Sequence, residues 1–344
     1  MSQGCCCTKN SGCCASVVDA CSVPTVSSLL SLKDILGAWK VRWGIGRMDY
    51  KVEPGLYAVG RPDSDSSVLV SANYKLTFDT LRKNLSGLDC WLLILDTKAI
   101  NVWCAAGKGT FGTAELVNRI EVTGLSEIVT HKKLIVPQLG ASGVSAHEVA
   151  KLTRFSIVYG PVRASDIKEF IVSGYKATKE MRTVKFNMWD RLVLTPIELG
   201  IIAKPSLLLF GVLFLINLFA ARPLGMEDFL AYIAAVLIGT MITPMLLPFI
   251  PGKTFAFKGW LLGVIGTAWI AWLYGWFTQP FLLLGIGYML ALPACSAFMA
   301  MNFTGASTYT SFSGVIKEMR FAVPAIVLSI VGGMTLILIK TFVG

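Results

Sequence analysis

The sequence of 344 residues predicts an α/β domain followed by a domain of five transmembrane helices. Two observations support this fold class. In the first half of the chain, short apolar strands alternate with amphipathic helices, which is typical of a mainly parallel sheet. In the second half, no Asp, Glu, Lys or Arg occurs from Gly259 to Ile316, a longer uncharged stretch than soluble cores contain. We expect a Cys-rich tail and linker over residues 1–50, a soluble domain over 51–190 and a membrane domain over 196–344.

The chain begins with a thiol-rich segment. Its cysteines are Cys5, Cys6, Cys7, Cys13, Cys14 and Cys21. Their spacing does not match the Cys run of a ferredoxin cluster, and in a cytosolic tail such residues are thiols or soft-metal ligands rather than disulfides. Two interpretations stay open: a disordered tail without a role, and a tail that captures a soft metal. One amphipathic segment, Leu29–Val41, follows.

The soluble domain is expected to alternate strands and helices along its length. The expected strands are Leu56–Val59, Ser67–Ser71, Cys90–Asp96, Leu134–Val136 and Phe155–Tyr159. The expected helices are Leu76–Asn84, Phe111–Arg119, Ala146–Thr153 and Ala164–Ser173. Ligands of such sheets bind where the strands end at their carboxyl termini. The loops expected there are Asn101–Gly109, Pro137–Ser145 and Tyr159–Ser165.

The second half of the chain contains the five expected membrane spans. They are Ser206–Ala221, Phe229–Ile250, Gly259–Phe277, Pro280–Met301 and Ala322–Val343. Lys and Arg are concentrated before the first span and in the second-to-third and fourth-to-fifth connections, which predicts a cytoplasmic soluble domain and an external C-terminus. We therefore expect a multi-pass protein of the cell inner membrane, in contact with membrane lipid. The polar, Cys-rich start has no signal-peptide pattern.

Other features of the spans and of the charge distribution narrow the function. No span has an interior charge except Lys340 near one end, which argues against an ion pump. Prolines are expected to kink or interrupt the helices at Pro244, Pro248 and Pro293. The net charge of +10 partly reflects membrane topology, and because the basic residues are scattered we expect no nucleic-acid partner. We expect both histidines to face solvent, so they suggest no catalytic site. Residues 107–112 match GxGxxG formally, but they do not directly follow a strand, so they do not indicate a dinucleotide-binding site.

The most informative segment is the octapeptide Asn101-Val102-Trp103-Cys104-Ala105-Ala106-Gly107-Lys108. Its thiol, Cys104, lies fourteen residues from the nearest other cysteine, Cys90, so it lacks the companion that a structural zinc site or a CxxC pair needs. Asn101 can cap a short helix. Cys104 would then lie in the first turn, where the helix dipole favours a thiolate. An inert buried thiol is the alternative interpretation.

The octapeptide resembles the cap-helix signature of the mercury-methylating corrinoid proteins, membrane-bound relatives of the corrinoid/iron–sulfur proteins. The resemblance continues through residues 138–144, 159–162 and the uncharged segment 302–314, and covers roughly residues 50–344. The first 22 residues depart from it. It implies a Rossmann-like corrinoid-binding domain in front of the membrane helices. The cofactor contacts that it implies are Asn101, Val102, Trp103, Cys104, Ala105, Ala106, Gly107, Lys108, Gly140, Ser142, Gly143, Val144, Tyr159, Gly160 and Pro161.

The resemblance also implies a function, a corrinoid-dependent methyltransferase that converts Hg(II) to methylmercury. Cys104 would be the catalytic residue, its thiolate the lower axial ligand of cobalt. A thiolate opposite a methyl group favours departure of the methyl with its bonding electrons, which a soft electrophile requires. The implied partners are a ferredoxin-like iron–sulfur protein as electron donor and a methyl donor protein or methyl-tetrahydrofolate-linked enzyme.

Two other functions stay open at this point. One is a corrinoid methyl carrier of one-carbon metabolism. The other is a soft-metal membrane transporter that uses the cysteines from Cys5 to Cys21. The candidate Hg(II) ligands among them are Cys5, Cys6, Cys7, Cys13 and Cys14. The uncharged segment 302–314 has two interpretations as well, a flexible connector or a polar lid over the cofactor.

Overall fold

The computed structural model describes residues 23–220 and 223–343, which divide into two compact units. The first unit comprises the described residues up to Ala38 together with residues 46–184, and the second comprises residues 39–45 and those from Lys185 onward. The predicted boundary at residue 190 thus lies slightly past the end of the first unit. The six N-terminal cysteines lie outside the described residues.

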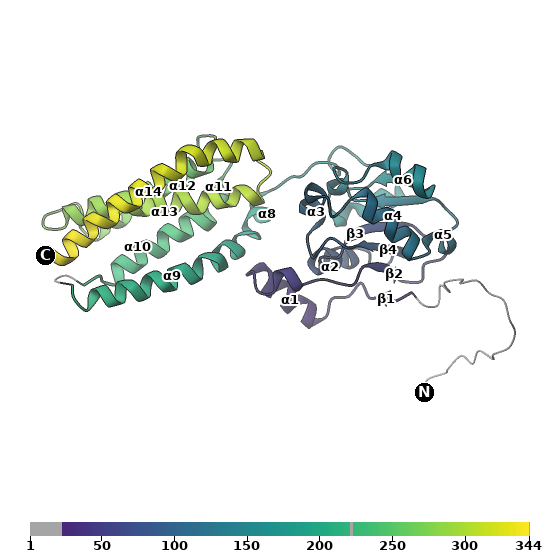
Figure 1. The fold of residues 1–344 in the computed structure, drawn as a ribbon, viewed down its shortest axis with the longest axis horizontal. Helices are drawn as coiled ribbons and strands as arrows, with labels where there is room; N and C mark the ends of the chain where they lie inside the picture. Colours follow the sequence, from purple (N-terminus) through teal and green to yellow (C-terminus); the bar gives the residue numbers. More distant parts are fainter. Residues whose placement is uncertain (1–22, 221–222, 344) are drawn as a thin grey trace, which may run out of the picture. The chain divides into compact units, whose positions relative to one another are not determined.

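The first unit is built on a six-stranded sheet in the order β1-β2-β4-β3-β5-β6 (Figure 1). The strands are β1 (Thr25–Val26), β2 (Gly55–Val59), β3 (Val68–Ala72), β4 (Cys90–Leu95), β5 (Lys133–Val136) and β6 (Ser156–Tyr159). Strand β2 pairs antiparallel with β4, and every other neighbouring pair is parallel. The α/β prediction is confirmed. The antiparallel direction of β2 and the presence of the two-residue strand β1 were not predicted.

Helices cover both faces of this sheet, as Figure 1 shows. One face packs against α3 (Val102–Lys108), α4 (Thr113–Val122), α5 (Leu125–Ile128) and α6 (Ala146–Thr153), and the other against α2 (Lys75–Asn84) and α7 (Ile167–Val172). Along β4, Leu93 and Leu95 enter the first core, whereas Leu92 and Ile94 enter the second. Because successive side chains of a strand point to opposite faces, burial on both sides explains the continuous apolar run of this strand.

An ion-pair network joins α1 (Leu32–Arg42), which overlaps the predicted amphipathic segment Leu29–Val41, to α2. Asp34 of α1 contacts Lys75 at 2.7 Å and Arg82 at 2.9 Å, and Asp79 contacts the same two basic residues at 2.7 and 2.8 Å. Partial burial raises the pKa of Asp34, but hydrogen bonds from Lys75, Ser31 and Arg82 outweigh burial and hold that pKa well below its ordinary value. The first half of α1 is therefore fixed to the α/β unit.

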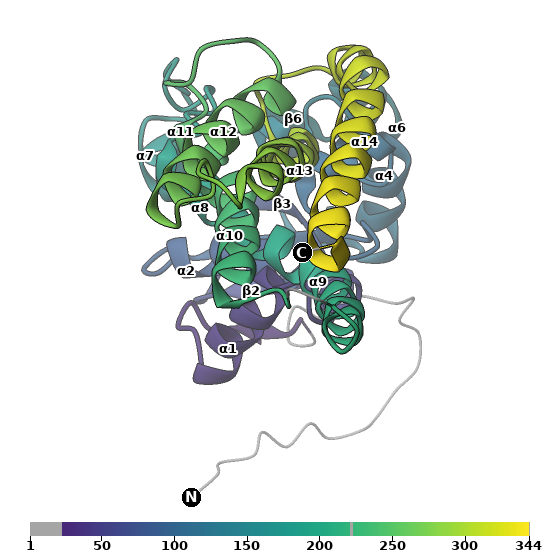
Figure 2. The ribbon, with the colours of Figure 1, turned by 90° about the vertical axis from the view of Figure 1, so that its left-hand side faces the viewer.

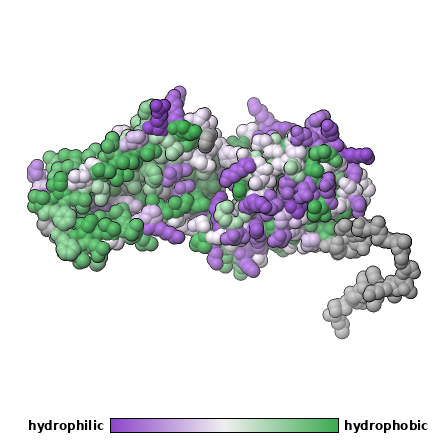
Figure 3. All heavy atoms as spheres, in the orientation of Figure 1, coloured by the Kyte–Doolittle hydropathy of each residue, from purple (hydrophilic) through white to green (hydrophobic). Residues whose placement is uncertain are grey.

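The second unit contains five helical segments that are long and apolar enough to cross a membrane: Met188–Asn217, Met226–Leu246, Phe255–Leu273, Leu282–Ala306 and Ser313–Val343. Their elements are α8 (Met188–Leu192), α9 (Thr195–Asn217), α10 (Met226–Leu237), a π-helical turn (Ile238–Ile242), α11 (Thr243–Leu246), α12 (Phe255–Leu273), α13 (Leu282–Asn302), a 3₁₀ turn (Phe303–Ala306) and α14 (Phe312–Val343). Figure 2 looks along these helices and shows α13 between α12 and α14. Figure 3 shows the apolar surface of the unit in green.

Two membrane helices begin before the apolar stretches that predicted them. Helix α9 starts at Thr195, before the predicted Ser206, and α14 starts at Phe312, before the predicted Ala322. A π-helical turn directly precedes α11, which contains Pro244, and the helical segment ends at Leu246, before Pro248. Helix α13 continues through Pro293, so the predicted interruption does not occur at Pro244 or Pro293. Charged residues at the ends of a span can remain at the level of the lipid headgroups, so the apolar run underestimates the length of the helix.

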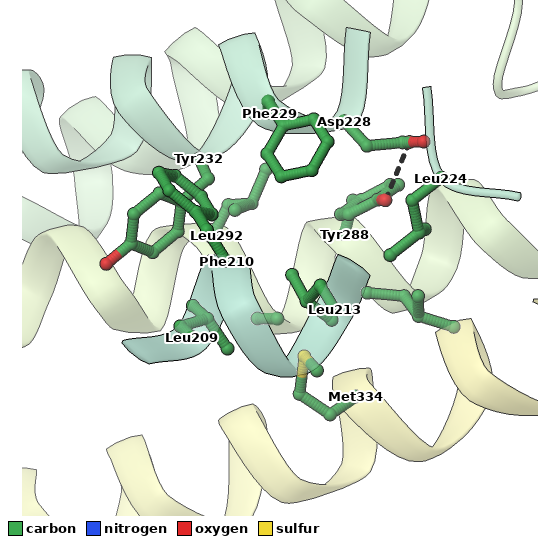
Figure 4. Close-up of a pocket in the computed structure, with 12 residues that line it drawn as sticks. Leu209, Phe210, Leu213, Leu224, Asp228, Phe229, Tyr232, Tyr288, Leu292 and Met334 are labelled. Atoms are coloured by element: carbon green, nitrogen blue, oxygen red, sulfur yellow. Dashed lines mark hydrogen bonds between the residues drawn. The ribbon is translucent and has the colours of Figure 1, made fainter. Parts of the chain in front are cut away.

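Two acidic residues of this unit, Asp228 and Glu318, are buried. Asp228 accepts a hydrogen bond from the hydroxyl of Tyr288 at 2.7 Å and one from the backbone N–H of Gly225 at 2.7 Å (Figure 4). The adjacent cavity, of about 70 Å³, is lined by apolar and aromatic side chains of α9, α10, α13 and α14. Glu318 accepts from the backbone N–H of Ala256 at 2.6 Å, at the start of α12. Both acids therefore satisfy helix starts.

The uncharged segment 302–314 is packed over its first part. Phe303 is buried and stacks on Phe186 at a centroid distance of 6.4 Å, and the Tyr309 ring lies 5.8 Å from the same ring. Arg191 donates to the Tyr309 hydroxyl at 3.3 Å. A flexible connector is thus wrong for residues 303–309. Their partners Phe186 and Arg191 belong to the second unit itself.

Candidate functional site

Cys104 lies in the first turn of α3, the helix that follows β4. Asn101 is extended at the N-cap, and its side-chain oxygen accepts a hydrogen bond from the Cys104 backbone N–H at 2.9 Å. Gly109 ends the helix in the left-handed conformation at φ 81°. The predicted capped helix with Cys104 in its first turn is confirmed.

Helix α3 buries one face and exposes the other. Val102, Ala105 and Ala106 are buried against the sheet, whereas Trp103 and Cys104 are exposed. The remaining described cysteines differ: Cys295 is half-buried, and burial raises the pKa of the Cys90 thiol to about 12. Among the described cysteines, Cys104 is thus the exposed one, and the buried thiol that was the alternative interpretation is not its state.

The loop after β5 packs directly on α3. A β-carbon at Gly140 would lie 2.5 Å from the Phe111 ring, and one at Gly143 would collide with the Phe111 carbonyl oxygen and lie 3.1 Å from Ala106 Cα. The Gly143 carbonyl accepts from the backbone N–H of Thr113 at 3.2 Å. These two glycines are therefore needed for the close approach of the two loops.

The loop after β6 joins the same cluster. The Tyr159 hydroxyl donates to the Val144 carbonyl at 2.8 Å, and the Gly160 N–H donates to the Val136 carbonyl at 2.8 Å. A β-carbon at Gly160 would lie 2.9 Å from Ile135. The three loops expected to cluster at the carboxyl edge of the sheet do so.

The predicted contact residues differ in exposure and fall into three groups: buried, exposed and half-buried. The buried ones shape the platform: Val102, Ala105, Ala106, Gly140, Val144, Gly160 and Pro161. The exposed ones form its surface: Trp103, Cys104, Gly107, Lys108 and Ser142. Asn101, Gly143 and Tyr159 are half-buried, and Asn101 and Tyr159 use their side chains in hydrogen bonds within the platform. A ligand on this surface would meet the second group.

Sequence reasoning missed Asn73, which follows β3 at the same edge and is buried. Its side-chain oxygen accepts from the Thr97 backbone N–H at 3.1 Å, the Thr97 hydroxyl at 2.9 Å and the Ala99 backbone N–H at 3.2 Å. Lys98 and Ala99 have φ values of 58°, which non-glycine residues rarely adopt. Asn73 therefore fixes the strained loop that leads into α3. A polar residue directly after an apolar strand was the signal.

The structure also describes the GxGxxG run of residues 107–112 and the two histidines. The N–H of Thr113, at the start of α4, is used by Gly143, which agrees with the rejection of a dinucleotide fingerprint in residues 107–112. His147 is exposed as expected. The expectation for His131 is wrong, because it is half-buried and its Nε2 lies 2.9 Å from the Ser66 carbonyl oxygen. The histidine packs where the β5 strand begins, away from the carboxyl edge.

Fold and site together describe an α/β unit in which Cys104, the exposed cysteine among those that the structure describes, lies on a capped helix among the loops at the carboxyl edge of the sheet. Residues 43–171 match the family model described as CO dehydrogenase/acetyl-CoA synthase delta subunit. This region contains α3 and the three clustered loops, whereas the five apolar segments lie beyond it.

Several curated relatives match a part of the chain. An acetyl-CoA decarbonylase/synthase complex subunit gamma of Methanopyrus kandleri is 33% identical over 127 residues, covering 36% of this chain and 27% of the relative. The gamma subunit of Methanocaldococcus jannaschii is 34% identical over 141 residues, covering 40% and 28%. Gamma subunit 2 of Methanosarcina thermophila is 38% identical over 99 residues, covering 28% and 21%. The chain spans about a quarter of the length of these relatives.

These similarities support a corrinoid protein. Proteins of the matched type bind a cobalamin-type cobalt cofactor, which is the cofactor that the sequence resemblance implies. The names of the relatives refer to a multi-protein acetyl-CoA decarbonylase/synthase complex, and mercury does not appear in them.

Proposed function

We propose that this chain is a membrane-anchored corrinoid protein that transfers methyl groups, with Cys104 as the ligand of cobalt. One observation carries the proposal: Cys104 is an exposed residue on a capped helix within residues 43–171, which match the family model of the CO dehydrogenase/acetyl-CoA synthase delta subunit. The five apolar segments support the membrane anchor, and the Lys/Arg asymmetry favours a cytoplasmic position of the α/β unit.

The surface around Cys104 fits a flat cofactor. A β-carbon at Gly107 or Gly109 would meet no atom within 4 Å, so space beside the thiol is open. Trp103 and Lys108 are exposed on the same helix, and their N–H groups are donors for the amide side chains of a corrin ring. An exposed cysteine next to small residues and hydrogen-bond donors is suited to binding a metal ion that a macrocycle holds.

A bound corrinoid supplies a cobalt centre that accepts and releases a methyl group. The residues of this chain orient and tune that centre. Asn101 holds the Cys104 backbone N–H, and the buried Val102 and Ala105 fix the helix on the sheet, so the thiolate has a defined position. A thiolate is a strong electron donor, so Cys104 would hold the cobalt and would favour release of a methyl group with its bonding electrons.

We propose Hg(II) as the methyl acceptor, because this soft electrophile requires the methyl group with its electrons. The octapeptide around Cys104 supports it as well. A second candidate is a methyl carrier of one-carbon metabolism, and the similarities to acetyl-CoA decarbonylase/synthase subunits favour this carrier over mercury methylation. The partners that we propose are a ferredoxin-like electron donor and a methyl donor protein.

A soft-metal transporter receives no support from the described part of the chain. Within residues 23–220 and 223–343, no group of three or more His, Cys, Asp or Glu side chains could hold a metal ion. For the N-terminal cysteines we propose a different role, capture of Hg(II) for the methyl transfer.

The two acceptors can be separated by product analysis. Full-length protein loaded with methylated corrinoid is incubated with Hg(II), and methylmercury is measured by mass spectrometry. We expect methylmercury from the wild type and none from Cys104→Ala, with Cys295→Ala as a cysteine control that keeps activity. Wild-type protein that passes its methyl group to a one-carbon acceptor but never to Hg(II) would establish the carrier instead.

A further inference from the structure

Helix α1 and the residues around it expose many large apolar side chains. Leu32 is 77% exposed, Leu36 62%, Trp39 63% and Trp43 42%. Leu29, Ile35, Ile45 and Met48 are also exposed. Single exposed apolar residues are ordinary, but a contiguous set of this size marks a surface that binds something.

These side chains form one stripe along the helix. At about 100° per residue, Leu32, Ile35, Leu36, Trp39 and Trp43 fall within an arc of about 100°. The stripe lies opposite Val41, which is buried, and away from Asp34, which is fixed by α2. The α1 helix, purple in Figure 1, thus has a protein-facing side and an uncovered apolar side.

Basic residues border the stripe on both sides. At the same angular spacing, Lys33 and Lys40 follow one edge of the stripe and Arg42 follows the other. Helices that lie in a membrane surface have this pattern: an apolar face with Trp and Leu, flanked by Lys and Arg that reach the anionic headgroups. Two tryptophans in the stripe fit the same location, because Trp is enriched at the level of the headgroups.

The end of α1 contacts the first membrane helix. A β-carbon at Gly200 of α9 would lie 2.6 Å from the Trp43 carbonyl oxygen, and one at Gly44 would lie 3.7 Å from Ile197. Residues 39–45 accordingly group with the second unit. The contact is at the start of α9, before Lys204 and the uncharged run that follows it, which is where a span leaves the headgroup layer.

We propose that α1 is an interfacial helix that lies in the cytoplasmic membrane surface. Its stripe from Leu32 to Trp43 is inserted at the boundary of headgroups and acyl chains, and its basic residues contact anionic lipid headgroups. The bilayer is the occupant that fits, because the stripe is continuous with a membrane helix and carries the complementary charge. The proposal requires the membrane insertion of the second unit but neither the corrinoid nor mercury.

The test is photo-crosslinking in full-length protein reconstituted into nanodiscs of phosphatidylcholine and phosphatidylglycerol. p-Benzoylphenylalanine replaces Leu36, which is exposed and whose replacement leaves the core intact. The control carries the same group at Val172, which is 84% exposed on α7. After irradiation, adducts are identified by mass spectrometry. We expect lipid adducts at position 36 at a yield at least several-fold above that at position 172.

Three outcomes would overturn the proposal: a covalent dimer, which would show that a second copy covers the stripe; a link to another segment of the chain; or no lipid excess over position 172. The charged border has its own test. Replacing phosphatidylglycerol by phosphatidylcholine should lower the lipid yield at position 36, and Lys33→Glu combined with Lys40→Glu should abolish that dependence. If the lipid yield at position 36 depends equally on phosphatidylglycerol in the charge-reversed protein and in the wild type, the proposed contact with anionic headgroups is wrong.

Discussion

Replacing Asn73 by Ala tests how the position of α3 is fixed. The change removes the acceptor of three hydrogen bonds and leaves the backbone N–H groups of Thr97 and Ala99 without it. Each buried unsatisfied N–H costs about 1–3 kcal/mol. The Thr97 hydroxyl keeps a second acceptor, the Ile100 carbonyl at 2.7 Å, and adds little. We therefore expect the loop to lose about 3 kcal/mol of local stability.

The assay is amide hydrogen exchange of residues 96–104, measured by mass spectrometry on the full-length protein. A loss of about 3 kcal/mol corresponds to roughly 100-fold faster exchange, since 1.4 kcal/mol is a factor of ten. Asn84→Ala is the matched control, because its side chain donates one exposed hydrogen bond to the Thr80 carbonyl. Exchange in Asn73→Ala within a factor of three of the wild type would refute the positioning role.

The remaining predictions concern the cap, the ion-pair network and the thiols. Asn101→Ala should cost about 1 kcal/mol of helix stability and weaken corrinoid binding, while Asn101→Asp keeps the acceptor and should retain most of the affinity, as titration of the two variants would show. Asp34 has a depressed pKa when folded, so its stabilising contribution is present above the ordinary carboxyl pKa and is lost as the pH falls through the depressed value; thermal unfolding of wild type and Asp34→Asn should converge only in strong acid. Iodoacetamide at mildly alkaline pH should alkylate Cys104 and spare Cys90, whose pKa is raised to about 12, and peptide mapping that finds Cys90 modified in the folded protein would contradict this.

Local periodicity predicts much of the fold. The apolar run of β4 and the alternation with helices predict the α/β class, because both arise from residues close in sequence. The direction of β2 could not be predicted, since pairing partners are chosen by contacts distant in sequence. The starts of α9 and α14 were missed for another reason: Glu198 and Lys317 are charged, and charge marks the end of an apolar run but not the end of a helix.

The site is predictable in part. Asn101 and Cys104 could be recognised because capping is a local interaction. The packing role of Gly140 and Gly143 could not, because it depends on the Phe111 ring and carbonyl, which reach these glycines only in the folded sheet. The positioning role of Asn73 could not be predicted for a similar reason, because it depends on the end of β3 lying beside the loop after β4.

The central claim, that Cys104 ligates cobalt, is tested most directly by cobalt K-edge X-ray absorption of the corrinoid-loaded protein. We predict one sulfur scatterer in the first coordination shell of the wild type and none in Cys104→Ala. A variant in which the six N-terminal cysteines are Ser should keep the sulfur scatterer, which separates Cys104 from the other thiols. Identical spectra for wild type and Cys104→Ala, in protein that binds the same amount of cobalt, would contradict the account.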